Sequence, residues 1–111
     1  MKYLMFVATD PDRPAEIDET GTVPIEEWVE KNDAAGTRVI GERLRPADQA
    51  VVVRRRGGKV SVTEGPFAET HEWIVGFDVL ECADLDEAIR VAAEHPMAVG
   101  GRLELRPFVT D

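Results

Sequence analysis

The chain has 111 residues, of which 43% are hydrophobic and 32% are charged, and its formal net charge is −9. This length fits one domain over residues 1–111, with enough apolar residues for one modest core. The negative charge disfavours nucleic acid as a partner, and the absence of a run of about 18 apolar residues excludes a membrane-spanning helix.

The cysteine content and the N-terminal residues indicate the cellular compartment in which the protein is expected, the cytoplasm. The single cysteine, Cys82, excludes an intramolecular disulfide and a multi-cysteine metal cluster, and its place near the end of an apolar strand favours a buried, inert thiol. The apolar N-terminal run is short and stops at Thr9-Asp10, unlike the apolar region of a signal peptide. We therefore expect a soluble cytoplasmic protein.

The first third of the chain predicts a strand, a loop and a helix. Residues 2–8 are apolar on both alternating faces, which indicates a central strand covered on each side. Residues 9–22 are rich in Asp, Pro, Glu and Gly and predict a long surface loop. A helix is expected over about residues 24–35, with Thr22 as its cap and Trp28 in its apolar stripe.

The middle of the chain predicts strands. Residues 37–44 indicate a strand, and residues 50–56 and 59–63 indicate two more that are joined by Gly57-Gly58, a connection suited to a tight hairpin turn. The basic run at the end of the first hairpin strand is interpreted as a solvated strand end or, alternatively, as a phosphate-binding patch. A long strand over about residues 72–81 follows.

The second helix has the clearest start signal in the sequence. Asp84 is a suitable cap, and Glu87 stands three residues later, as in a capping box. Apolar residues then recur at helical spacing up to His95-Pro96, which ends the helix. A last strand is expected over about residues 102–109.

The predicted order is that of an α+β protein with a ferredoxin-like βαββαβ sheet and an inserted β-hairpin. Two helices can cover one face of such a sheet. The first and fifth strands nevertheless carry apolar residues on both faces, for example Leu4 and Phe6 opposite Tyr3 and Met5. A second copy of the chain would cover the other face, so we expect a homodimer packed sheet to sheet.

A set of motifs resembles the DGPF-type branch of the YCII-related family. The segment Gly65-Pro66-Phe67-Ala68-Glu69-Thr70, followed by Glu72, is similar to the signature of that branch. Further matching segments occur in the family's order and cover nearly the whole chain: Gly41-Glu42, Leu44-Arg45-Pro46, Gly76-Phe77, Leu85-Asp86-Glu87-Ala88 and Glu104-Leu105-Arg106-Pro107. The resemblance implies a dimeric alpha/beta barrel.

The chain departs from this family's pattern at two signature positions. Glu64 stands where the branch usually has Asp, and His71 stands where it usually has Lys. Better-studied YCII relatives are thought to use a His–Asp pair with an early His, but no His precedes His71 here, so that pair is not carried over. The resemblance of the family to muconolactone isomerases and monooxygenases concerns the fold and does not assign a reaction.

The signature supplies the catalytic candidates. His71, with Glu69 and Glu64 close in sequence, could form an acid/base site in which the carboxylates raise the pKa of the imidazole. Phe67 and Thr70 would line a ligand pocket beside it. Alternatively, these residues form a turn whose polar groups satisfy one another.

Three further residues are candidates for the pocket. His95 could supply a ligand group, or it could be a protonated imidazole that favours the negative end of a helix. Asp78 interrupts an apolar strand and could be a pocket acid with a raised pKa, or an ion-pair partner of Arg102 or Arg106. Trp73 is expected in the core or the pocket lining. Glu69, His71 and His95 make a poor zinc site, so no metal is expected.

Two functional hypotheses remain open. The first is an uncharacterised small-molecule-binding dimer, with a possible accessory or regulatory role. The second is a cofactor-independent enzyme that acts on a small organic substrate with His71 as general acid or base. No Gly-rich phosphate loop and no nucleophile–base motif occurs in the sequence, so we expect no nucleotide or other organic cofactor.

Overall fold

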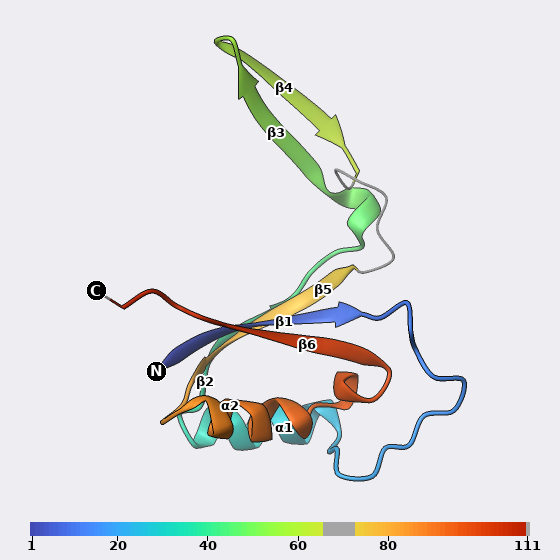
Figure 1. The fold of residues 1–111 in the computed structure, drawn as a ribbon, viewed down its shortest axis with the longest axis vertical. Helices are drawn as coiled ribbons and strands as arrows, with labels where there is room; N and C mark the ends of the chain where they lie inside the picture. Colours follow the sequence, from blue (N-terminus) through green and yellow to red (C-terminus); the bar gives the residue numbers. More distant parts are fainter. Residues whose placement is uncertain (66–72, 111) are drawn as a thin grey trace.

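The computed structural model describes residues 1–65 and 73–110 and has the expected α+β architecture (Figure 1). In chain order the elements are β1 (Lys2–Thr9), α1 (Ile25–Ala34), β2 (Arg38–Arg43), the short 3-10 helix η1 (Ala47–Gln49), β3 (Val51–Arg56), β4 (Lys59–Glu64), β5 (Ile74–Glu81), α2 (Leu85–Ala93), the 3-10 helix η2 (Pro96–Ala98) and β6 (Gly101–Pro107).

Four strands form an antiparallel sheet in the order β2-β5-β1-β6, so the ferredoxin-like arrangement is confirmed. β1 lies in the centre, where Met5 stands opposite Asp78 of β5 on one side and opposite Leu105 of β6 on the other. β2 is an edge strand whose Gly41 stands opposite Asp78. Because side chains alternate between faces, this register places Met5, Gly41 and Asp78 on the same face of the sheet.

Both helices lie on that face and form the core with it (Figure 1). The largest fully buried side chains are Trp28, Tyr3, Met5 and Leu80. The Trp28 indole Nε1–H donates a hydrogen bond of 2.9 Å to the Val91 carbonyl, which ties α1 to α2. Neither helix is long or apolar enough to cross a membrane.

The opposite face of the sheet, which we call the open face, is also apolar. Leu4 and Phe6 of β1 stand opposite Val79 and Phe77 of β5 there, and all four side chains are half-buried. Ile40 of β2 stands next to Val79 and is 51% exposed. The prediction that the central strands are apolar on both faces is therefore confirmed.

β3 and β4 form a separate two-stranded sheet that projects from the body (Figure 1). Gly57 and Gly58 have φ angles of 57° and 75°, the left-handed values that a two-residue hairpin turn requires and that glycine adopts without a steric penalty. The predicted hairpin and its turn are confirmed.

The two long helices begin differently. Asp84 caps α2 as predicted, and its Oδ1 accepts a hydrogen bond of 2.9 Å from the Glu87 N–H. The prediction that Thr22 caps α1 is wrong, because the helix begins after Pro24 and no side chain caps it. Thr22 lies two residues too early, and its hydroxyl donates instead to the Glu19 carbonyl at 2.8 Å.

We predict that Asp84→Ala lowers the free energy of unfolding by about 1 kcal/mol, because the Glu87 N–H at the start of α2 loses its acceptor. Urea denaturation followed by circular dichroism measures this change. Asp84→Ser is the matched control, since a serine hydroxyl can accept the same hydrogen bond and should retain most of the stability. An equal loss in both variants would contradict a capping role.

Candidate functional site

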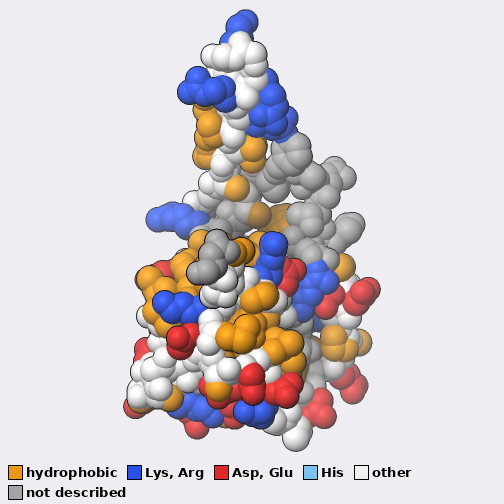
Figure 2. Space-filling model, turned by 60° about the vertical axis from the view of Figure 1, so that its left-hand side comes forward, with side chains coloured by type: hydrophobic (Ala, Val, Ile, Leu, Met, Phe, Trp, Pro, Cys, Tyr) orange, Lys and Arg blue, Asp and Glu red, His pale blue; other side chains and the backbone are white. Residues whose placement is uncertain are grey.

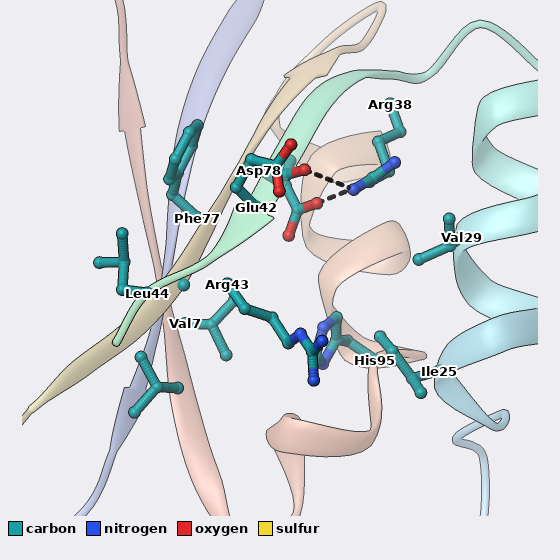
Figure 3. A pocket seen from close by; sticks show the side chains of 13 residues that line it. Val7, Ile25, Val29, Arg38, Glu42, Arg43, Leu44, Phe77, Asp78 and His95 are labelled. Carbon is teal, nitrogen blue, oxygen red and sulfur yellow. Dashed lines mark hydrogen bonds and ion pairs between the residues drawn. The ribbon is translucent and has the colours of Figure 1, made fainter. Parts of the chain in front are cut away.

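A cavity of about 480 Å³ lies between β2, β5 and α1, on the face of the sheet that the helices cover (Figure 3). Its wall combines apolar side chains with charged and polar ones. The apolar lining comprises Val7, Ile25, Val29, Leu44 and Val75, and Phe77, whose position alternates onto the open face, also borders the cavity. The polar lining comprises Arg38, Glu42, Arg43, Asp78 and His95.

Two glycines of the sheet make room in this wall. A Cβ at Gly41 would collide with the Asp78 carboxylate and the Arg38 guanidinium. A Cβ at Gly76 would lie 3.0 Å from the Glu42 carbonyl oxygen, which is closer than packed atoms normally approach. The sheet can therefore hold charged side chains beside Gly41 without its strands moving apart.

Asp78 forms an ion pair with Arg38 in this space. The Arg38 Nε–H donates to Asp78 Oδ1 at 2.7 Å, and Arg38 Nη2 donates to the Gly41 carbonyl at 3.0 Å. The predicted partners, Arg102 and Arg106, are wrong because β6 pairs with β1 and is separated from β5 by that strand. The edge strand β2 is adjacent to β5 and supplies the arginine instead.

Burial and charge act in opposite directions on this pair. Desolvation raises the pKa of Asp78, and the hydrogen bond and charge of Arg38 offset part of that rise. Desolvation lowers the pKa of Arg38, but Asp78 and Asp33 raise it by more, so the guanidinium stays charged. Asp33 is the outer partner, at 3.0 Å from Arg38 Nη1 and half-exposed.

His95 is buried at the other side of the cavity and is neutral. Desolvation lowers its pKa to about 4, and its Nδ1 accepts a hydrogen bond of 3.0 Å from the Met97 N–H. The expectation of a protonated imidazole at a helix end is therefore wrong. The ring also packs edge-on against Trp28, with centroids 4.8 Å apart, in a surrounding that disfavours charge.

The hydrogen bond to Nδ1 determines where the His95 proton lies. Because Nδ1 is an acceptor, the ring proton is on Nε2. Within the described part of the chain no group pairs with Nε2, and no unpaired side-chain nitrogen or oxygen is sealed from solvent there. The Nε2–H is thus a donor without a partner among the described residues, on a ring that lines the cavity.

Arg43 is the charged group at the mouth of the cavity. It extends from β2 toward the space between the sheet and α1 (Figure 3). In contrast to Arg38, it forms no ion pair with a carboxylate among residues 1–65 and 73–110. The cavity therefore presents an exposed cation without a partner in the described structure.

Several predicted site residues lie elsewhere. Glu64 is exposed at the end of β4, and Trp73 is 40% exposed just before β5; neither lines this cavity. Phe67, Glu69, Thr70 and His71 lie outside the described residues. Among the described residues, no group of three or more His, Cys, Asp or Glu side chains could hold a metal ion.

Arg38 and Arg43 were missed as pocket residues by the sequence interpretation. Both stand on β2 opposite positions of β5 that face the helices, Arg38 opposite Leu80 and Arg43 opposite Gly76. Alternation from Gly41 could have placed Arg43 on the covered face. Cys82 is buried as predicted, and desolvation raises the pKa of its thiol, which keeps it unreactive.

We predict that Arg38→Met lowers the free energy of unfolding by about 3 kcal/mol at pH 7, because it leaves the buried Asp78 carboxylate without its partner. The matched control is Asp33→Asn, which removes the exposed partner of the same guanidinium and should cost less than about 1 kcal/mol. Urea denaturation measures both values. A similar loss of unfolding free energy in the two variants would show that the contact of Arg38 with Asp78 stabilises the fold no more than its contact with Asp33.

We also predict a pH dependence due to His95. Its pKa in the folded state is about 4 and its ordinary value is 6.5, so the unfolded chain binds the proton more tightly. The contribution of the neutral ring is complete above pH 6.5 and is lost as the pH falls through 4, by roughly 3 kcal/mol in total.

The variant His95→Asn isolates this effect, because an asparagine oxygen can accept from the Met97 N–H but does not titrate. Urea denaturation of both proteins at several pH values between 7 and 4 gives the difference curve, in which the other acidic groups cancel. The wild type should lose more stability than the variant on acidification. A flat difference would contradict a neutral buried His95.

Comparison with known proteins gives the family. A curated relative, "Uncharacterized protein R00369" from Rhizobium meliloti (strain 1021), is 42% identical over 68 residues, which are 60% of this chain. The match spans 55% of the length of that relative. The sequence model of the YCII-related domain matches residues 1–110. The chain therefore belongs to the YCII-related family.

Proposed function

We propose that this YCII-related protein binds a small organic acid with an apolar body in the cavity between β2, β5 and α1. The observation that carries the proposal is the combination of an apolar wall with Arg43, a cation that forms no ion pair with a described carboxylate. A volume of about 480 Å³ is within the usual range of small-molecule sites.

The carboxylate of the ligand would pair with the Arg43 guanidinium. Arginine presents two parallel N–H groups that match the two oxygens of a carboxylate, and such charge-assisted pairs are stronger than neutral hydrogen bonds. Arg38 is unsuited to this role because Asp78 and Asp33 already hold its guanidinium. Arg43 is thus the anchor, and the apolar wall receives the body of the ligand.

His95 would supply a second polar contact. Its neutral ring offers the Nε2–H as a donor without adding charge, so it suits a carboxylate or carbonyl oxygen of the ligand. Because the ring is fixed by Met97 and Trp28, it is preorganised for this contact.

We further propose that the protein acts as a cytoplasmic homodimer of the dimeric alpha/beta-barrel type within the DGPF-type branch. The support is the open face, where the apolar side chains of β1 and β5 are half-buried while both helices lie on the opposite face. Light scattering should give twice the mass of the 12.3 kDa chain. A mass equal to one chain at micromolar concentration would contradict this.

The catalytic hypothesis stays a prediction that depends on His71. That residue, Glu69, Phe67 and Thr70 lie outside the described residues, and Glu64 is exposed on the hairpin. A ligand-binding role, including an accessory or regulatory one, draws on the described cavity alone. We therefore put binding first and leave the reaction unassigned.

We predict that benzoate or hexanoate binds at millimolar or lower concentration and that Arg43→Gln weakens this binding at least about tenfold, or 1.4 kcal/mol. Isothermal titration calorimetry measures the affinity. The affinity for benzamide, the neutral analogue of benzoate, should fall less on the Arg43→Gln change. Arg45→Gln is the control, since Arg45 is exposed nearby and outside the cavity. Equal affinity in both variants, or no binding of either acid, would overturn the proposal.

A further inference from the structure

The β3–β4 hairpin is a structural element without a core of its own. Among the described residues, its two strands make their main contacts with each other, and they pair along their whole length from Val51–Glu64 to Arg56–Lys59. An isolated two-stranded hairpin is at best marginally stable in water. The folded hairpin therefore requires a surface on which to pack.

One face of the hairpin is suited to such packing. Val53 stands directly opposite Val62, and alternation puts Val51 and Val60 on the same face. These four valines, which we call the valine face, are 54 to 65% exposed. The other face carries mainly basic and hydroxyl side chains, with Arg54 opposite Ser61 and Val52 opposite Thr63, whereas Arg55 stands opposite Val60 and shares the valine face near the turn. The hairpin is thus amphipathic although it projects away from the body.

The dimensions of the chain agree with an arm that extends toward another molecule. The radius of gyration is 16.2 Å, and the longest extent is 49 Å. A compact chain of this length would have a radius of gyration of about 13 Å. The longest extent runs along the hairpin, which stands clear of the sheet and helices (Figure 1).

The charge of the β3–β4 hairpin indicates which molecule it binds. Residues 51–64 contain four of the 13 basic residues and one of the 22 acidic residues, so the hairpin has a net charge of +3 and the rest of the chain −12. Figure 2 shows the basic side chains around the tip of the hairpin and acidic ones over the lower body. The hairpin of one copy is therefore complementary in charge to the body of another.

We propose that the β3–β4 hairpin is an exchanged arm, which packs its valine face against the body of a second copy of this chain. This extends the homodimer proposed above and rests on it. The receiving surface is the open face and the apolar groove that continues from it past Val79. That groove is lined by Met1, Phe108 and Val109 together with Lys2 and Glu81, and the Glu81 carboxylate lies 3.5 Å from the N-terminal ammonium.

The arrangement is reciprocal, as a two-fold dimer requires. The hairpin leaves the body between β2 and β5, at the end of the sheet where Ala8 stands opposite Ile74. The groove lies at the opposite end, where Lys2 stands opposite Glu81. Two copies whose open faces meet with their strands reversed bring each arm to the groove of the other.

Two matched double variants test this proposal. Val60→Lys with Val62→Lys adds two charges to the valine face of β4, whereas Ser61→Lys with Thr63→Lys adds two charges to its other face. Analytical ultracentrifugation should show at least a tenfold weaker dimer for the valine variant and less than a threefold change for the control. Far-ultraviolet circular dichroism and tryptophan fluorescence check that the body stays folded in each.

A second measurement identifies the partner directly. In wild-type protein mixed from ¹³C-methyl-valine-labelled and unlabelled copies, isotope-filtered NOEs should connect hairpin valine methyls with ring protons of the unlabelled copy, Phe108 foremost. Equal dimer affinity in the two double variants, or a dimer without such NOEs, would overturn the arm. Neither of these two results bears on the proposal that an acid binds at Arg43. Conversely, if the NOEs are present but benzoate and hexanoate do not bind, the acid-binding proposal fails and the exchanged arm is supported.

Discussion

The structure depends on one geometric constraint, that two short helices cover one face of a four-stranded sheet. On the covered face the constraint produces a small core around Trp28, whose indole bonds to the backbone of α2. On the open face it leaves Leu4 and Phe6 of the central strand half-buried. The cavity belongs to the first face, and the proposed contacts between copies belong to the second.

The covered face is not uniformly apolar, and its polar groups explain the cavity. Asp78 interrupts an apolar strand and needs a cation, which the edge strand supplies through Arg38. The pair needs space, which Gly41 provides because it has no side chain. The charged pair thus maintains a wall on which Arg43 and His95 can face a ligand.

The fold could be predicted from the sequence because its signals are local. The apolar alternation of β1, the two glycines of the hairpin turn and the Asp84 cap each depend on a few neighbouring residues. Of the two predicted caps, Asp84 is confirmed and Thr22 is wrong, and position explains the difference. Asp84 directly precedes its helix, whereas Pro24 separates Thr22 from the start of α1.

The candidate site was less predictable because its contacts join distant residues. Asp78 was identified as an unusual carboxylate, but its partner depends on strand order, and Arg38 is 40 residues away. His95 was identified as a pocket residue, but its neutral state depends on burial against Trp28 and a bond from Met97. Arg43 lies on an edge strand, where an arginine usually faces solvent, and only alternation from Gly41 indicates that it stands on the covered face.

The net charge of −9 acts in opposite directions on the two proposed contacts. It disfavours the binding of an acid in the cavity, whereas it favours the contact of the basic hairpin with the body of another copy. An acid approaching from a distance meets a repulsive field, which salt screens beyond about 8 Å at physiological ionic strength. Inside that distance Arg43, which forms no ion pair with a described carboxylate, would dominate, because Asp78 and Arg38 neutralise each other. Selectivity for the proposed acid would therefore come from one local cation, and its affinity would come largely from the apolar wall. The same separation of charge favours association of the basic hairpin with an acidic body, so contacts between copies and acid binding can coexist without competing for the same groups.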